Sequence, residues 1–166
     1  HQFNFGKASD KVLVGDWDGD GVDTLGVRRG HTFFLNNSFV GGDAEISFKY
    51  GKDADEILVG DWDGNGTDTV ALRRDITIHV TNTLAGGNAE TSFKYGRSSD
   101  EVYAGDFDGD GKDTIAIRRG NAFHIRNELS GGPASTVLGY GRASDRVLLG
   151  DWDGNGIDTP GVNRVH

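Results

Sequence analysis

The sequence predicts an all-β protein, and more narrowly a β-propeller built from four 45-residue, four-stranded repeats of which the last is incomplete. Three observations support this prediction. One motif recurs at a fixed spacing, short apolar runs alternate with Gly-rich turns, and no segment has a convincing helical period.

The repeat is visible in an acidic motif. Gly15–Gly19 reads GDWDG, and the same stretch returns every 45 residues as GDWDG, GDFDG and GDWDG. We therefore interpret the chain as one repeat domain. It is divided into an outer strand at 1–6, full repeats at 7–51, 52–96 and 97–141, and a partial repeat at 142–166.

Each repeat contains four candidate strands. Lys11–Gly15 (KVLVG) is a short apolar run, and after the acidic loop TLGVRR alternates apolar and polar residues. In the third segment Phe33 and Leu35 share one face, whereas Phe34 points the other way. A Gly41-Gly42 turn leads to the fourth segment, ISFKYG. This pattern is typical of short antiparallel strands.

A four-stranded unit of this length has the size of a propeller blade, and neighbouring blades must stack to bury its apolar faces. Ring closure stays open at this level. The strand at 1–6 could complete the last blade, two chains could share a larger ring as a homo-oligomer, or the chain could be a piece of a longer propeller.

Composition narrows the class of protein. The net charge of −9 argues against a nucleic-acid partner, which needs a basic face. The chain has no Cys, and no apolar stretch is long enough for membrane insertion. It has no Met and begins at His1, so we expect a mature or excised segment of a longer protein.

The acidic residues cluster in the pattern D-x-D-G-[DN]-G-x-D-T. Oxygen side chains at loop positions 1, 3 and 5, a Gly at position 6 and a backbone carbonyl at position 7 form the cage that a hard cation of Ca²⁺ size prefers. About four Ca²⁺ ions, one per repeat, would neutralise most of the net charge. The candidate metal ligands are Asp16, Asp18, Asp20, Val22 and Asp23; Asp61, Asp63, Asn65, Thr67 and Asp68; Asp106, Asp108, Asp110, Lys112 and Asp113; and Asp151, Asp153, Asn155, Ile157 and Asp158.

Two features of this loop leave alternatives open. Asp/Gly-rich loops can be simple turns, although four copies in register favour a metal site. The last ligand is either the Asp at position 8, which we favour, or the Thr at position 9, because neighbouring strand residues face opposite ways. Asn65 and Asn155 carry no charge at position 5, so their loops should bind the ion more weakly.

The stretch GDFDGDGKDTIAIRR (105–119) resembles the calcium loops of FG-GAP repeats, as in integrin α-subunit propellers and the related VCBS-like repeats of bacteria. Phe5-Gly6 falls where that family has its FG dipeptide. The resemblance covers nearly the whole chain. It implies a propeller with Ca²⁺ in the loop between the first and second strand of each blade, and a secreted, extracellular or cell-surface location. The Asp at position 8 departs from the family, which usually has its last acidic ligand at position 9.

Other recurrent residues have competing interpretations. The aromatic residue at position 2, Trp17 in the first loop, is expected to pack between blades rather than to stack on sugars. Of Arg28 and Arg29, one is expected to pair with Asp10 while the other is solvated. An exposed ring of such arginines could instead bind an anionic glycan or a teichoic-type polymer. We find no nucleophile motif, and four equal sites do not suit catalysis.

Together these features predict a non-catalytic calcium-binding module of a secreted protein that binds glycan, cell-wall polymer or a protein partner. Weak equivalent sites would add up by avidity. The alternative is a calcium-stabilised structural or assembly module without a ligand of its own.

Overall fold

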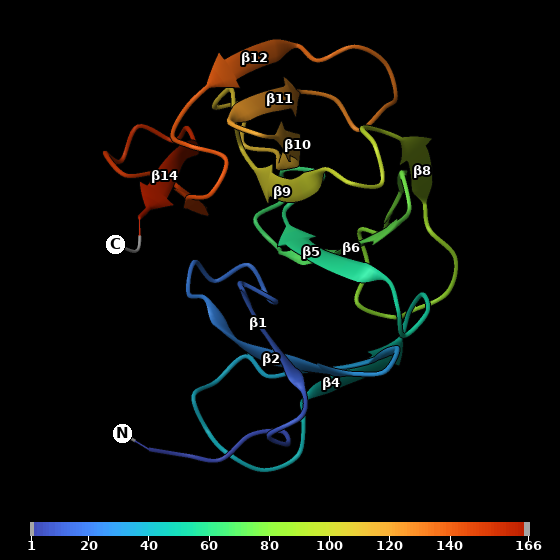
Figure 1. The fold of residues 1–166 in the computed structure, drawn as a ribbon. Coiled ribbons are helices and arrows are strands. Elements are labelled where there is room, and N and C mark those ends of the chain that lie inside the picture. The colour runs from blue at the N-terminus through green and yellow to red at the C-terminus, as the bar shows by residue number, and fades with distance from the viewer. Residues whose placement is uncertain (1, 165–166) are drawn as a thin grey trace.

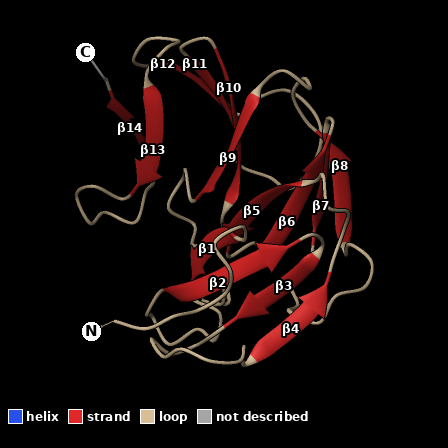
Figure 2. Ribbon diagram, turned by 60° about the horizontal axis from the view of Figure 1, so that its bottom comes forward, coloured by secondary structure: helices blue, strands red, loops and turns tan. Residues whose placement is uncertain are grey.

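The computed structural model describes residues 2–164, which form an all-β protein of four antiparallel sheets (Figures 1 and 2). The first sheet holds β1 (Lys11–Gly15), β2 (Thr24–Arg29), β3 (Thr32–Leu35) and β4 (Ile46–Lys49). The second holds β5 (Glu56–Gly60), β6 (Thr69–Arg74), β7 (Thr77–Val80) and β8 (Thr91–Lys94). The third holds β9 (Glu101–Gly105), β10 (Thr114–Arg119), β11 (Ala122–Arg126) and β12 (Thr136–Gly139), and the fourth has only β13 (Arg146–Gly150) and β14 (Thr159–Asn163).

The prediction of a propeller is wrong, although its all-β part is confirmed. The described residues form separate sheets of four, four, four and two strands, and these sheets do not close into a ring or barrel. Figure 1 shows them in an open arc, with the first and last described residues on the same side. Residues 2–6 form no strand, and residue 1 lies outside the described part, so the predicted outer strand is not observed. The physical reason is that an isolated strand without a paired neighbour gains no ladder hydrogen bonds.

Within each sheet the strands pair with their sequence neighbours in one register. In the first sheet Lys11 lies opposite Arg28 and Gly15 opposite Thr24, and the same pairing recurs in the second, third and fourth sheets. Positive φ angles at glycines such as Gly21 (+84°) and Gly42 (+114°) allow the tight turns between strands. The repeat of 45 residues therefore corresponds to one antiparallel sheet.

The apolar core lies between successive sheets rather than within one sheet. One cluster joins Trp17, Phe33 and Leu35 of the first repeat to Val70 and Leu72 of the second sheet. An equivalent cluster joins the second and third sheets. The inner strands β1, β5, β9 and β13 contact one another in that order. Each sheet is therefore covered by its neighbour along the chain.

The exposure of the aromatic residue at loop position 2 depends on this packing between sheets. Trp17 and Trp62 are each only 3% exposed because the following sheet covers them, which confirms the predicted packing role. Trp152 in the last repeat has no following sheet, and it is 59% exposed. The same residue at the same loop position is therefore core or surface depending on the neighbouring repeat.

The first arginine of each pair connects one repeat to the next. Arg28 donates from Nη1 to the carbonyl of Asp55 (2.8 Å) and from Nη2 to the carbonyl of Lys52 (2.5 Å). Arg73 and Arg118 make the same two contacts with the third and fourth repeats. All three side chains are buried, so the prediction that one arginine of the pair is solvated is wrong. Burial is tolerated because carbonyl dipoles accept from the charged guanidinium.

The second arginine pairs with the recurrent aspartate of its own repeat, as predicted. Arg74 donates from Nε and Nη2 to the two carboxylate oxygens of Asp55, at 2.8 and 2.6 Å. Equivalent two-point pairs join Arg29 to Asp10, Arg119 to Asp100 and Arg164 to Asp145.

Residues 2–164 contain no helix that is long and apolar enough to cross a membrane.

Replacing Arg73 with Met should lower the free energy of unfolding by about 3 kcal/mol, because charge-assisted hydrogen bonds across the junction are lost and two carbonyls lose their donor. Urea unfolding followed by circular dichroism measures the change. Asn163 occupies the equivalent position in the last repeat and is a matched control, so Asn163→Met should change the free energy by less than about 0.5 kcal/mol. Equal effects of the two variants would contradict the junction role of Arg73.

The paired aspartates also predict a dependence of stability on pH. Hydrogen bonds from Arg164 lower the pKa of Asp145 from 3.8 to about 2. Because the folded pKa is the lower one, this contribution is present above pH 3.8 and is lost as the pH falls towards 2. Asp145→Asn should therefore be less stable at neutral pH but should lose less stability between pH 5 and pH 2. Urea titrations with excess chelator test this, and identical acid slopes for the two proteins would refute it.

Candidate functional site

Two kinds of site recur along the chain, and the first is the acidic loop that connects the first two strands of each sheet. In the loop between β1 and β2, the Asp16 carboxylate accepts backbone N–H bonds from Gly19 (2.8 Å), Asp20 (3.2 Å) and Gly21 (2.7 Å). Asp61, Asp106 and Asp151 hold their own loops in the same way. The backbone of each loop thus wraps around the carboxylate of its position-1 aspartate.

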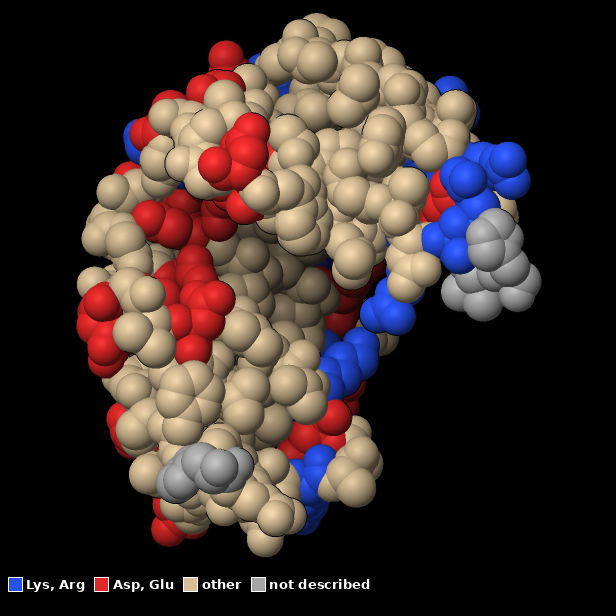
Figure 3. All heavy atoms as spheres, turned by 90° about the vertical axis from the view of Figure 1, so that its left-hand side faces the viewer, with Lys and Arg blue, Asp and Glu red and all other residues tan. Residues whose placement is uncertain are grey.

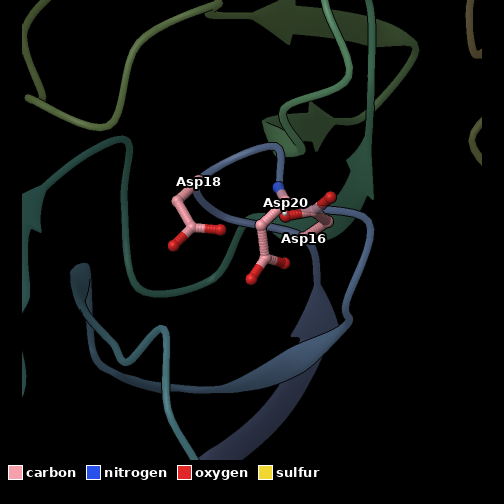
Figure 4. Close-up of side chains that lie close together, drawn as sticks. All are labelled: Asp16, Asp18 and Asp20. Atoms are coloured by element: carbon pink, nitrogen blue, oxygen red, sulfur yellow. Dashed lines mark hydrogen bonds between the residues drawn. The ribbon is translucent and has the colours of Figure 1, made fainter.

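This winding brings further carboxylates together. Oxygens of Asp16, Asp18 and Asp20 lie within 4.8 Å of one another, and Figure 4 shows their side chains gathered around the first loop. Asp106, Asp108 and Asp110 form the same group in the third loop. The second and fourth loops have two carboxylates and one amide oxygen, from Asp61, Asp63 and Asn65 and from Asp151, Asp153 and Asn155.

The donor set of these loops fits a hard cation. It consists of carboxylate and amide oxygens, which Ca²⁺ prefers, and it contains no His or Cys. Each carboxylate has about four lone-pair positions, so Asp16 can accept backbone N–H bonds and still contact an ion. Asp18 and Asp20 are exposed, which leaves their oxygens accessible. The structure therefore brings together positions 1, 3 and 5 of the first and third loops.

The aspartate at loop position 8 does not lie where the sequence predicted, among the ligands of its own loop. Asp68 does not join the group formed by positions 1, 3 and 5 of its own loop. Its Oδ2 accepts from the backbone N–H of Asp16 in the preceding loop at 2.9 Å, and its own N–H donates to the carbonyl of Asp16 at 2.7 Å. Asp113 and Asp158 bind the preceding loops in the same manner. Asp23 belongs to the first of the described sheets, and it is exposed.

These position-8 carboxylates are held in an unfavourable environment. Burial, together with the neighbouring carboxylates of Asp68, Asp158 and Asp61, raises the pKa of Asp113 to about 7, although the hydrogen bond from Asp61 opposes the rise. Burial also raises the pKa of Asp68 and the pKa of Asp158. A cation in the adjoining loops would favour the ionised form of these side chains.

Positions 7 and 9 are also used for packing. The side chain of Thr67 lies against Gly19 of the preceding loop, where an added Cβ would come within 2.9 Å of its Oγ1. Lys112 and Ile157 contact the preceding loops in the same way, whereas Val22 is exposed. At position 9 the hydroxyl of Thr24 donates to the carbonyl of Asn36 at 2.6 Å, so this side chain closes the strand end.

The second kind of site is a shallow pocket that recurs at the same place in the first three repeats. Each pocket lies between the aromatic-Gly turn that precedes the sheet, the second arginine of β2, β6 or β10, a side chain of the third strand, and the Gly-Gly turn. The main lining residues are Phe5, Gly6, Val27, Arg29, Phe34 and Ala44; Tyr50, Gly51, Leu72, Arg74, His79 and Ala89; and Tyr95, Gly96, Ile117, Arg119, His124 and Ala134. The volumes are about 240, 220 and 340 Å³.

The pockets combine an apolar floor with polar groups at the rim. In the second pocket Leu72 and Ala89 provide the apolar surface, while Arg74 and His79 provide polar groups. Burial lowers the pKa of His79, which favours the neutral imidazole. In the first pocket Arg29 lies over the ring of Phe34 at 5.1 Å. The fourth repeat keeps Tyr140, Gly141 and Arg164, but its described residues include no third strand or Gly-Gly turn to complete a pocket.

Sequence reasoning did not identify these pockets as sites. It noted the Phe5-Gly6 dipeptide, the arginine pair and the Gly41-Gly42 turn one by one. A signal was present, because all of these recur at fixed repeat positions and on one side of the sheet. Only the folded chain shows that they meet.

Charge is unevenly distributed over the surface. Figure 3 shows Asp and Glu gathered along one edge of the molecule, and Lys and Arg along the opposite edge. The basic edge also contains acidic atoms beside the basic ones, as the arginine–aspartate pairs require.

Comparisons with known proteins inform the fold. No family model matches the sequence, and no curated protein matches it. Among solved structures, the chain is similar to a lectin from Agrocybe aegerita that is described as recognising non-reducing terminal N-acetylglucosamine. The TM-score is 0.58 at 14% sequence identity. The match covers 90% of this chain but 45% of the lectin, so the chain spans less than half of that protein's length. At this identity the likeness describes the fold.

Proposed function

We propose that the protein is a non-catalytic carbohydrate-binding module stabilised by calcium. The observation that carries the proposal is the presence of three equivalent pockets with an apolar floor and a polar rim. The similarity in fold to a glycan-recognising lectin also supports a carbohydrate-binding function.

The pockets suit a small polar ligand. Drug-sized ligands occupy pockets of about 300–1,000 Å³, so the pockets here match a single sugar unit better than a larger molecule. A sugar has one apolar face and a ring of hydroxyl groups, which Leu72 with Tyr50 and Arg74 with His79 can contact respectively. The terminal N-acetylglucosamine recognised by the similar lectin is the first ligand to test.

Repetition compensates for shallow sites. Each pocket has few polar groups, so we expect weak binding of one sugar. Three pockets held in one chain would bind a surface with many sugar ends far more tightly, because later contacts become intramolecular. This favours a glycan-coated surface or a cell-wall polymer as the natural partner.

Calcium has a structural role in this proposal. Asp16, Asp18 and Asp20 would hold one ion, and the corresponding residues of the other loops would hold up to one ion each. The ion supplies positive charge that offsets carboxylate repulsion, and it stabilises the folded form by mass action. The proposal includes a secreted or cell-surface setting, because exposed sites of extracellular modules bind Ca²⁺ at about 10⁻⁴–10⁻³ M.

Removal of calcium should lower the melting temperature, because an ion that binds only the folded protein at 100 times its Kd contributes about 2.7 kcal/mol. Differential scanning fluorimetry with and without excess chelator measures the shift. Asp106→Ala should remove about one bound ion per chain in elemental analysis. Asp23→Asn is the matched control, because position 8 lies outside the ligand group and the ion count should not change. A melting curve that does not respond to chelator would count against the calcium sites.

Replacing His79 and His124 together with Ala should abolish sugar binding at the second and third pockets and leave the first. Isothermal titration calorimetry with N-acetylglucosamine should then give about one site instead of three, and capture on a glycan-coated surface should weaken by at least about tenfold. His31→Ala is the control, because His31 is a half-exposed histidine that contacts Asp53 outside the pockets. The absence of saturable binding on a broad glycan array would overturn the proposal.

A further inference from the structure

We infer that these pockets select uncharged sugars over anionic ones, because the arginine in each pocket is already neutralised by an aspartate of its own repeat. This inference rests on the proposed carbohydrate function and names its ligand class. It also excludes the anionic polymers that an unpaired ring of arginines would attract.

The pairing geometry carries the argument. Arg74 uses Nε and Nη2 to bind both oxygens of Asp55, at 2.8 and 2.6 Å. The Asp55 side chain is only 2% exposed, whereas that of Arg74 is 40% exposed. The aspartate therefore lies beneath the arginine. A ligand that pulled Arg74 away would leave the Asp55 carboxylate buried without a partner, which is energetically costly.

A guanidinium in this state still binds neutral groups. Two of its five N–H groups are used by Asp55, and the others remain able to donate to a hydroxyl or a carbonyl oxygen. A second carboxylate would have to share one positive charge with Asp55 at short range, so like-charge repulsion disfavours it. The pocket therefore offers hydrogen bonds without a net charge.

The remaining charged residues of the pockets are few. Arg74 is the one fully charged residue among those lining the second pocket, and His79 beside it favours its neutral form. In the first pocket Lys7 is balanced by Asp43. The third pocket contains Lys94 in addition to Arg119, so it should discriminate least.

The test compares two sugars that differ by one carboxylate, N-acetylglucosamine and its C6-oxidised uronic acid form. Titration calorimetry on the protein carrying Lys94→Gln should give at least about tenfold weaker binding of the acid. Comparable or tighter binding of the acid would overturn this inference and leave the carbohydrate function intact. Failure of both sugars to bind, with failure on the glycan array, would overturn both.

A charge variant provides the second arm. Asp55→Asn leaves the charge of Arg74 uncompensated, so the preference for the neutral sugar should shrink at least about threefold in that protein. Asp53→Asn removes an exposed carboxylate outside the pockets and is the matched control. If Asp55→Asn does not fold by circular dichroism, Asp10→Asn tests the same effect through Arg29. An unchanged preference in a folded variant would contradict the role of the pairs.

Discussion

No sheet of this protein buries its own faces, and the contact between successive repeats is the constraint on which the rest depends. A four-stranded sheet exposes two faces, so a repeat is stable only when its neighbours cover it. Trp17 at 3% exposure and Trp152 at 59% show the same residue with and without that cover. The junction is also polar, because Arg28, Arg73 and Arg118 each donate to carbonyls of the next repeat.

The acidic loops belong to the same junction. Position 8 of each following loop hydrogen-bonds the position-1 aspartate of the loop before it, so the loops form a connected series rather than isolated sites. This arrangement explains why the position-8 acids recur in register along the chain although they do not join the ligand group of their own loop. A cation bound in one loop would thereby also steady the contact between two repeats.

None of the three pockets is lined by a residue of the acidic loops, and each pocket depends on the second arginine. Its aspartate partner is buried, so the guanidinium is held in place and its charge is compensated. The two neighbouring arginines of a repeat therefore have different roles. Arg73 hydrogen-bonds the next repeat, whereas Arg74 lines a pocket. Alternation along a strand makes this possible, because adjacent side chains face opposite sides.

The sequence by itself determined the all-β class, the 45-residue unit, the strands and the convergence of Asp16, Asp18 and Asp20, because these follow from local periodicity and from short loops. It also predicted that one of Arg28 and Arg29 pairs with Asp10, and the structure shows that this is Arg29. Tertiary structure alone decided the rest. The sheets remain separate instead of closing, Arg28 is buried at a junction, and Asp68 binds the preceding loop rather than its own. These outcomes depend on contacts between residues about one repeat apart, whose geometry no local pattern specifies.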